Sequence, residues 1–202
     1  GIGGFALDGP QAIVATRDGD VFVAGSSSDT ILRIPAADGV EQVLGPAGVE
    51  GVPLSEPTAL ALGPDDSVYV GAHAAVYRLA GGTASLHYTD PAFVAPKDLV
   101  VGPDATIYAS TDAVTAIAPD GRASQIVGRF GDGVHALSVP DGLALDGPGR
   151  LYVAGQFSYN VLRAGTAPDP GAALGGLAAL AALALCRHRG GLTGRRRGTG
   201  DA

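Results

Sequence analysis

The side chains whose spacing best suits chemistry follow four prolines, Pro10, Pro57, Pro96 and Pro140. The residues directly after them are Gln11, Thr58, Lys97 and Asp141. A hard cation such as Ca²⁺ takes several oxygen ligands, so carboxylates converging from this position would form a metal site. Only Asp141 is a carboxylate, and the Lys97 ammonium would repel a cation. Asp141 is therefore one candidate ligand for Ca²⁺ or another divalent metal, although an Asp after Pro is also an ordinary turn residue.

Other groups could also do chemistry, but each has a simpler interpretation. The turns at 17–20 (RDGD) and 63–66 (GPDD) could hold Ca²⁺, yet a hairpin turn explains them without a metal. Histidines could serve a lyase as acid or base, but they share no spacing, and surface histidines are the default: His73, His87, His135 and His188. No nucleophile-elbow, zinc-protease, phosphate-loop or dinucleotide motif occurs. A catalytic role is therefore uncertain, and a non-enzymatic one is favoured.

The prolines begin four copies of one phrase, which must position any such side chains. The copies align without a gap, and an aromatic residue stands twelve positions after each proline: Phe22, Tyr69, Tyr108 and Tyr152. Their starts are 47, 39 and 44 residues apart. Repeats near 40 residues with this density of strand-forming residues are typical of propeller blades, each a four-stranded antiparallel sheet. The sequence therefore predicts an all-β fold, a β-propeller with about four blades.

Each copy predicts the same strand order. A first strand alternates apolar and other residues, a Gly/Asp/Pro turn follows, and the second strand is apolar on both faces, as in VFVAG (21–25). Such a strand fits a sheet that is sandwiched between neighbouring blades. Third strands follow in all four copies, and fourth strands in three, at 40–44, 85–89 and 124–128. The last copy has no fourth strand.

The two ends of the repeat region are incomplete. Residues 1–10 align with residues 131–140 at a constant offset of 130, but no fourth strand precedes Gly1. We therefore expect an arc that is the C-terminal part of a larger propeller, with a closed four-bladed ring as the alternative. Third-strand arginines recur in three copies, and we expect them to pair with acidic side chains between blades rather than to bind an anion: Arg33, Arg78 and Arg163.

These motifs resemble the NHL-type propeller repeat over residues 1–166. The matching pieces in the first copy are Pro10, Asp18-Gly19, VFVAG, Asp29 and ILRI. The last copy also resembles, in PDGLALDGPGRLYVA, the segment around a metal-ligating Asp in propellers of the SMP-30/gluconolactonase superfamily. That second resemblance implies a metal-dependent lactonase-type hydrolase with Asp141 as a ligand, and it is one alternative function. A lyase-type propeller is another.

The C-terminal tail differs from the repeats in charge and hydropathy. Residues 1–170 carry 8 Lys+Arg and 19 Asp+Glu (8 − 19 = −11), whereas residues 171–202 carry 5 and 1 (5 − 1 = +4). The acidic body argues against a nucleic-acid partner. We expect residues 167–170 to form a Pro-rich linker, 171–189 an apolar helix with arginines, and 190–202 a basic, disordered end. The single cysteine, Cys186, lies in this tail, so residues 1–170 can form no internal disulfide and no Cys-based metal site.

The tail resembles the PEP-CTERM sorting signal of bacterial surface proteins. Pro168-Asp169-Pro170 takes the place of Pro-Glu-Pro, and Arg187 and Arg189 follow the apolar stretch 171–186. The resemblance implies export, a membrane contact and a sorting protease. A plain transmembrane anchor with the propeller outside is the alternative, and a soluble helix is a third. Together the features predict an exported or surface-sorted propeller that binds a protein or glycan. This function needs no cofactor.

Overall fold

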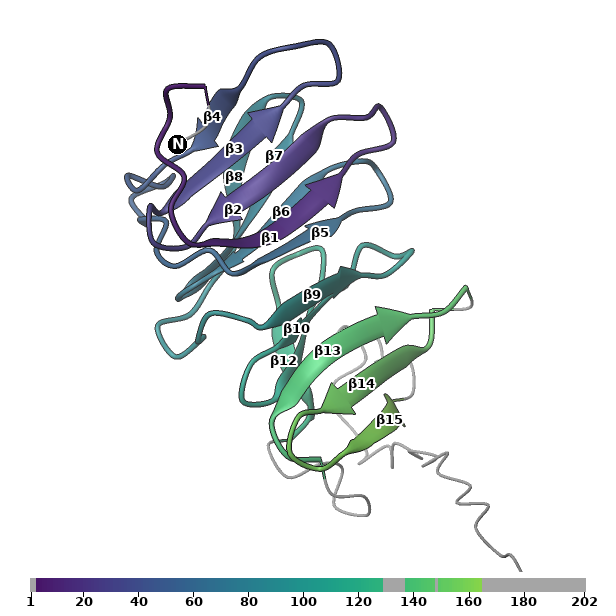
Figure 1. Ribbon diagram of the computed structural model, residues 1–202. Helices are drawn as coiled ribbons and strands as arrows, with labels where there is room; N and C mark the ends of the chain where they lie inside the picture. Colours follow the sequence, from purple (N-terminus) through teal and green to yellow (C-terminus); the bar gives the residue numbers. More distant parts are fainter. Residues whose placement is uncertain (1–2, 129–136, 148, 165–202) are drawn as a thin grey trace, which may run out of the picture.

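A computed structural model describes residues 3–128, 137–147 and 149–164, which form fifteen strands in four antiparallel sheets (Figure 1). The first sheet contains β1 (Pro10–Ala15), β2 (Val21–Gly25), β3 (Thr30–Ile34) and β4 (Glu41–Leu44). The second contains β5 (Ala59–Leu62), β6 (Val68–Ala72), β7 (Ala75–Ala80) and β8 (Thr83–Thr89). The third contains β9 (Asp98–Val101), β10 (Ile107–Ser110), β11 (Val114–Ile117) and β12 (Ala123–Val127). The fourth contains β13 (Pro140–Leu145), β14 (Leu151–Gly155) and β15 (Asn160–Ala164).

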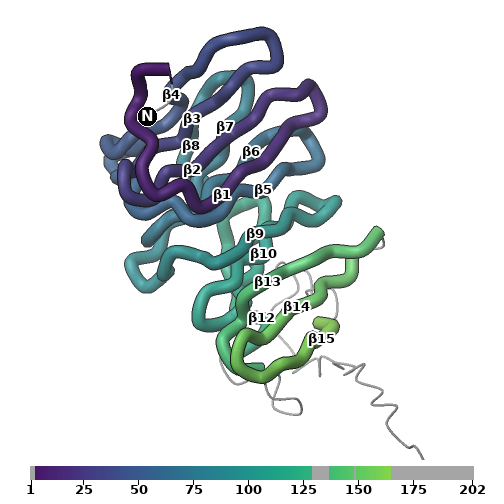
Figure 2. The backbone as a smooth tube through the Cα atoms, viewed as in Figure 1, coloured from purple at the N-terminus to yellow at the C-terminus, as the bar shows by residue number. Residues whose placement is uncertain are grey.

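The observed strands and their order within the four sheets confirm the predicted propeller. Each sheet is a simple meander in which every strand pairs with the next in the chain. First strands of successive sheets contact one another, β1 with β5, β5 with β9 and β9 with β13, so they form the inner side of the arrangement. The four sheets follow one another as an open arc, with β1–β4 at one end and β13–β15 at the other (Figure 1, Figure 2).

The core consists of three layers, one between each pair of neighbouring sheets. Phe22 and Ile31 of the first sheet pack with Tyr77 of the second. Tyr69 of the second packs with Ile107 of the third. The third and fourth sheets meet in a layer that includes Tyr108, Val114, Leu151 and Leu162. The repeated aromatic residue thus faces the next sheet, and each sheet is stabilised by its neighbours rather than by a core of its own.

The prediction that second strands are buried on both faces is correct for three sheets and wrong for the fourth. Strands β6 and β10 are buried throughout, and β2 nearly so. In β14, however, buried residues alternate with half-buried ones, Tyr152 and Ala154. The physical reason is the place of β14 in the arc: among the described residues, no sheet packs on the face that carries these two side chains.

The offset of 130 between residues 1–10 and 131–140 is confirmed where both segments are described. Ser26 and Ser27 donate backbone hydrogen bonds to the carbonyls of Gly9 and Asp8, at 2.9 and 3.1 Å. Their counterparts Gln156 and Phe157 donate to Val139 and Ser138, at 3.0 and 3.2 Å. The segment ahead of β1 therefore has the same local structure as the segment ahead of β13.

One repeated core position was not identified from the sequence. Three residues before each proline stand Leu7, Leu54, Phe93 and Leu137. Leu54, Phe93 and Leu137 are buried in the three layers between sheets. This column lies ahead of the proline at which each predicted repeat begins, so the repeat pattern did not include it.

Candidate functional site

Polar side chains gather where β9 and β13 begin, and we name Lys97, Asp98, Asp141 and Gln156 the strand-start cluster. Asp98 opens β9, and Asp141 is the second residue of β13. Gln156 lies in the loop between β14 and β15. Since successive strands are antiparallel, the start of a first strand and the loop after a second strand lie at the same end of a sheet. The repeat geometry alone therefore brings these residues together.

The Lys97 ammonium links the two sheets at this cluster. Its Nζ lies 3.7 Å from Oδ1 of Asp141 and donates a hydrogen bond to Oε1 of Gln156 at 3.4 Å. Both contacts are long, and the Lys97 and Asp141 side chains remain 37% and 50% exposed. An exposed, long ion pair contributes little to stability. Both charged groups therefore remain accessible to a polar ligand.

Asp98 lies deeper and holds the third and fourth sheets in register. Its carboxylate accepts hydrogen bonds from the backbone N–H of Leu143 at 2.7 Å and of Leu99 at 2.9 Å. Burial raises the pKa of Asp98, the two backbone hydrogen bonds oppose this, and the charge of Asp141 adds to the rise. The repeat draws attention to the residue directly after each proline, whereas Asp98 stands one position further on, so Asp98 was not predicted from the sequence.

Two exposed aromatic side chains follow Gln156 in the same loop. Phe157 is 62% exposed and Tyr159 is 91% exposed. Tyr159 has a left-handed backbone with φ of 51°, and its counterpart in the first sheet, Asp29, has φ of 49°. Asp tolerates this conformation better than an aromatic residue does, so Tyr159 carries backbone strain. An exposed aromatic residue at a strained loop position is a candidate for a binding role.

Among the described residues, Asp141 is not joined by a cluster of converging acidic side chains. Asp141 faces the Lys97 ammonium, and both Asp98 oxygens accept backbone hydrogen bonds. Within residues 3–128, 137–147 and 149–164, no group of three or more His, Cys, Asp or Glu side chains could hold a metal ion. The assignment of Asp141 as a metal ligand therefore stays a prediction, and no catalytic step is derived from it.

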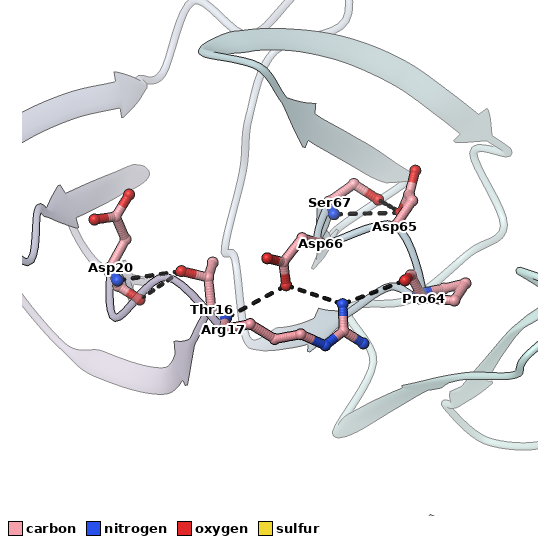
Figure 3. Close-up of polar contacts among 7 residues, drawn as sticks. All are labelled: Thr16, Arg17, Asp20, Pro64, Asp65, Asp66 and Ser67. Atoms are coloured by element: carbon pink, nitrogen blue, oxygen red, sulfur yellow. Dashed lines mark hydrogen bonds and ion pairs between the residues drawn. The ribbon is translucent and has the colours of Figure 1, made fainter.

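A groove of about 470 Å³ lies at the opposite end of the first and second sheets, where the turns at 16–20 and 65–67 meet. The Arg17 guanidinium donates to Oδ1 of Asp66 and to the carbonyl of Pro64, both at 3.2 Å, and joins the two turns (Figure 3). In the second turn, Asp65 accepts hydrogen bonds from the Ser67 hydroxyl and amide (Figure 3). These two turns are the ones that could hold Ca²⁺, and three of their carboxylates have arginine partners: Asp20, Asp65 and Asp66. The exposed aromatic residues beside the strand-start cluster, Phe157 and Tyr159, make that cluster the better candidate site.

Two of the three third-strand arginines, Arg33 and Arg78, pair with carboxylates, but not between blades as expected. Arg33 contacts Asp20 and Glu41 of its own sheet. Arg78 contacts Asp65, which precedes β6 of the same sheet. The expectation was wrong about location because the turn before the second strand lies beside the third strand, and so supplies the carboxylate from within the sheet.

Two of the four histidines, His73 and His87, lie within the described residues. His73 lies in the turn between β6 and β7, as expected, and His135 and His188 lie outside the described residues. His87 of β8 is not a satisfied surface residue, because its Nε2 is buried without a hydrogen-bond partner. Its ring packs edge-on against Tyr69, with centroids 5.3 Å apart. Burial lowers the pKa of His87, and this position away from the strand-start cluster indicates a packing role.

The predictions for the tail concern residues outside the described part of the chain. They include the linker at 167–170, the apolar segment 171–189 and the sorting residues Pro168, Asp169, Pro170, Arg187 and Arg189. Among the described residues, no helix has the length and apolar character needed to cross a membrane. The sorting signal therefore rests on the sequence alone.

Solved structures with the same arrangement are β-propellers. Virginiamycin B lyase from Staphylococcus aureus matches 79% of this chain and 53% of its own, with 16% identity and a TM-score of 0.63. A gluconolactonase from Xanthomonas campestris matches 75% and 56%, with 16% identity and a TM-score of 0.54. A nidogen/laminin complex matches 76% and 59%, with 13% identity and a TM-score of 0.59. The chain spans slightly over half of these structures, and at such identities they show the fold alone.

No protein-family model matches the chain, and no curated protein does either.

Proposed function

We propose that this chain is an exported recognition propeller that binds a glycan or a protein at the strand-start cluster. The observation that carries the proposal is one accessible charged pair, Lys97 and Asp141, beside a loop with two exposed aromatic residues, Phe157 and Tyr159. Aromatic faces stack on apolar surfaces, whereas an ammonium and a carboxylate provide directed hydrogen bonds. Binding residues at the loops of a rigid scaffold fit this role.

Binding is tested with the full chain in mild detergent against a glycan array and against the exported proteins of its host. Tyr159→Ala is expected to weaken binding about fivefold, since aromatic contacts contribute about 1 kcal/mol. Lys97→Gln is expected to weaken it and to reduce its salt dependence. Asp66→Asn, at the opposite end of the molecule, is the control. Loss of binding with Asp66→Asn but not with Tyr159→Ala would refute the proposed site.

A second candidate is a lactonase-type hydrolase or a lyase. The observation that favours it is a carboxyl with a raised pKa, Asp98, close to a second carboxylate, Asp141, at the end of the inner strands. Perturbed carboxyl groups are common at catalytic sites. Hydrolysis of gluconolactone with and without added divalent metal, and cleavage of virginiamycin B, test the two reactions. Turnover that Asp141→Asn abolishes would favour the enzyme over the binding module.

The tail supports a surface location for this module. An apolar segment followed by arginines, after Pro168-Asp169-Pro170, fits a signal that a membrane protease recognises and removes. The test is the intact mass of the protein exported by its own host. A mass that ends near Pro168, and retention of the tail when Pro168 and Pro170 are both replaced by Ala, would support sorting. A mass that retains Arg187 and Arg189 would leave a plain anchor.

A further inference from the structure

Lys97 of the strand-start cluster is the single lysine of the chain, which has 13 Lys and Arg residues in total. Five of the described arginines contact a carboxylate in or next to a hairpin turn: Arg17, Arg33, Arg78, Arg122 and Arg150. Lys97 instead directly precedes β9, at the opposite end of the sheets, and faces Asp141 of the next sheet. An ammonium is a compact point charge, whereas a guanidinium is a planar fork. The one ammonium of the chain therefore stands where a compact cation fits.

The segment of β13 that carries Asp141 is held by two polar side chains of the third sheet. The buried Ser110 hydroxyl donates a hydrogen bond to the carbonyl of Asp141 at 2.7 Å. The Asp98 carboxylate accepts one from the N–H of Leu143, also at 2.7 Å. The pairing of β13 with β14 is irregular here, between Pro140 and Leu143. The third sheet therefore fixes the backbone of Asp141 across the boundary between the two sheets.

These two polar residues occur only in the third copy of the repeat. The other copies have alanine or glycine at both positions: Ala12, Ala59 and Gly142 in place of Asp98, and Ala24, Gly71 and Ala154 in place of Ser110. Small apolar residues are thus sufficient to build the sheets. A polar group away from water costs free energy unless it is hydrogen-bonded, and both of these groups bond to the backbone of β13. Asp98 and Ser110 are therefore positioning residues for Asp141.

The donor atoms around Asp141 do not fit a divalent metal. Both Asp98 oxygens accept backbone hydrogen bonds, Oε1 of Gln156 accepts one from Lys97, and the Lys97 ammonium faces Oδ1 of Asp141. A metal ion at Asp141 would be repelled by this ammonium. Burial and the charge of Asp141 both raise the pKa of Asp98, so the two carboxylates repel each other. The positive charge of Lys97 compensates this repulsion.

We propose that the Lys97 ammonium is the built-in cation of the strand-start cluster and occupies the place where a divalent metal would otherwise bind at Asp141. Ligand binding at this cluster then needs no metal, a consequence that rests on the proposed function. The inference separates the two candidate functions, because a hydrolase that depends on a metal at Asp141 needs a different cation at the same position.

Mn²⁺ tests which cation the cluster accepts, since Mn²⁺ prefers oxygen ligands and broadens the NMR signals of nearby amides. In the full chain in mild detergent, we expect substoichiometric Mn²⁺ to leave the amide signals of Leu99 and Leu143 sharp. Lys97→Gln should make both signals broaden severalfold, whereas Lys97→Arg, which keeps the charge, should not. Adding Asp141→Asn to Lys97→Gln should restore sharp signals. Broadening in the native protein that Asp141→Asn removes, or no change with Lys97→Gln, would overturn the proposal.

Carbodiimide coupling tests the ion pair itself without a ligand. The reagent joins an amine to a contacting carboxylate as an amide with loss of water, and the single lysine makes the product easy to map by mass spectrometry. We expect a Lys97–Asp141 amide whose yield millimolar Ca²⁺ leaves unchanged and Ser110→Ala lowers severalfold. Ser67→Ala is the matched control, because it removes an equally buried hydroxyl at the opposite end of the sheets. Protection by Ca²⁺, or equal loss with Ser67→Ala, would contradict the proposal.

The outcome for the proposed function is kept separate by a third measurement. A glycan that the array identifies is titrated into the full chain with and without EDTA, and equal affinity is expected. Loss of binding in EDTA would overturn the inference and leave the proposed function standing. If no ligand binds at all, the proposed function fails, whereas the Mn²⁺ and coupling results still decide whether Lys97 is the cation of this cluster.

Discussion

The hydroxyl of Tyr77 donates a hydrogen bond to the carbonyl of Pro53, 2.7 Å away, and fastens the loop before β5 to the middle of the second sheet. Tyr77 is fully buried in the layer between the first and second sheets. We expect Tyr77→Phe to lower the free energy of unfolding by about 1 kcal/mol, because the part-buried hydrogen bond to the carbonyl of Pro53 is lost. Urea unfolding measures the change. Tyr159→Phe, at a 91% exposed position, should change it by less than about 0.5 kcal/mol. Equal effects would show that this hydrogen bond is unimportant.

Gly71 is the position in β6 where a side chain has no room. A Cβ there would meet the Pro96 ring and the Leu99 side chain of the neighbouring sheet. We expect Gly71→Ala to destabilise the protein by about 1–3 kcal/mol, because the second and third sheets would be forced apart. Gly147→Ala is the control, since nothing lies within 4 Å of a Cβ there. Thermal unfolding of the two variants gives the comparison, and an unchanged midpoint for Gly71→Ala would contradict the packing described.

His87 should make stability fall in mild acid. Burial lowers its pKa in the folded protein below the ordinary 6.5, while the nearby Arg78 charge acts in the same direction. The unfolded chain therefore takes up the proton first, and the stability present above pH 6.5 is lost as the pH falls from there towards the folded pKa. Urea unfolding midpoints at several pH values, with those of His87→Phe for comparison, measure this loss.

The His87→Phe protein should not show the loss of stability that the native protein shows as the pH falls below 6.5. His73→Gln, in the turn between β6 and β7, should leave it in place. A pH profile that is identical in the native protein and in His87→Phe would assign the acid sensitivity to another group.

Asp65 should stay ionised to a lower pH than an ordinary aspartate. The Ser67 hydroxyl, 2.5 Å from its carboxylate, and the Arg78 guanidinium, at 2.6 Å, lower the pKa of Asp65 from 3.8 to about 2. Its contribution to stability is present above pH 3.8 and is lost as the pH falls towards 2. Ser67→Ala and Arg78→Gln should each raise this pKa, as measured by NMR titration of the carboxyl carbon. Arg122→Gln, which removes a partner of Asp120 instead, should leave Asp65 unchanged.

The strand order was predictable because it depends on local signals that recur in each copy. A proline, an alternating strand, a Gly/Asp turn and an apolar strand specify a hairpin without knowledge of the rest of the chain. The register Tyr69 to Arg78 and Phe22 to Arg33 follows from that hairpin. The burial of β14 could not be predicted in the same way, because it depends on whether another sheet packs beside the fourth.

The candidate site was only partly predictable. Asp141 and Lys97 share one repeat position, so the alignment of the repeats identified both residues. In the structure, Nζ of Lys97 lies 3.7 Å from Oδ1 of Asp141. Asp98 stands at a different repeat position and acts through the backbone of Leu143, a contact between sheets that no local pattern encodes. The loop that carries Phe157 and Tyr159 has the same backbone course as its counterpart in the first sheet, and only the side chains differ. The exposure of these two side chains depends on the position of the loop in the arc.

Each sheet is a meander of strands that are consecutive in the chain, and among the described residues no strand is exchanged between sheets. A unit that starts at one proline and ends before the next can therefore be duplicated or deleted as a single DNA segment. Such a change leaves every remaining strand with its original hydrogen-bonding partner and creates one new junction between neighbours. The architecture is thus suited to growth and loss by whole units of about 40 residues, each of which keeps its own internal strand pairing.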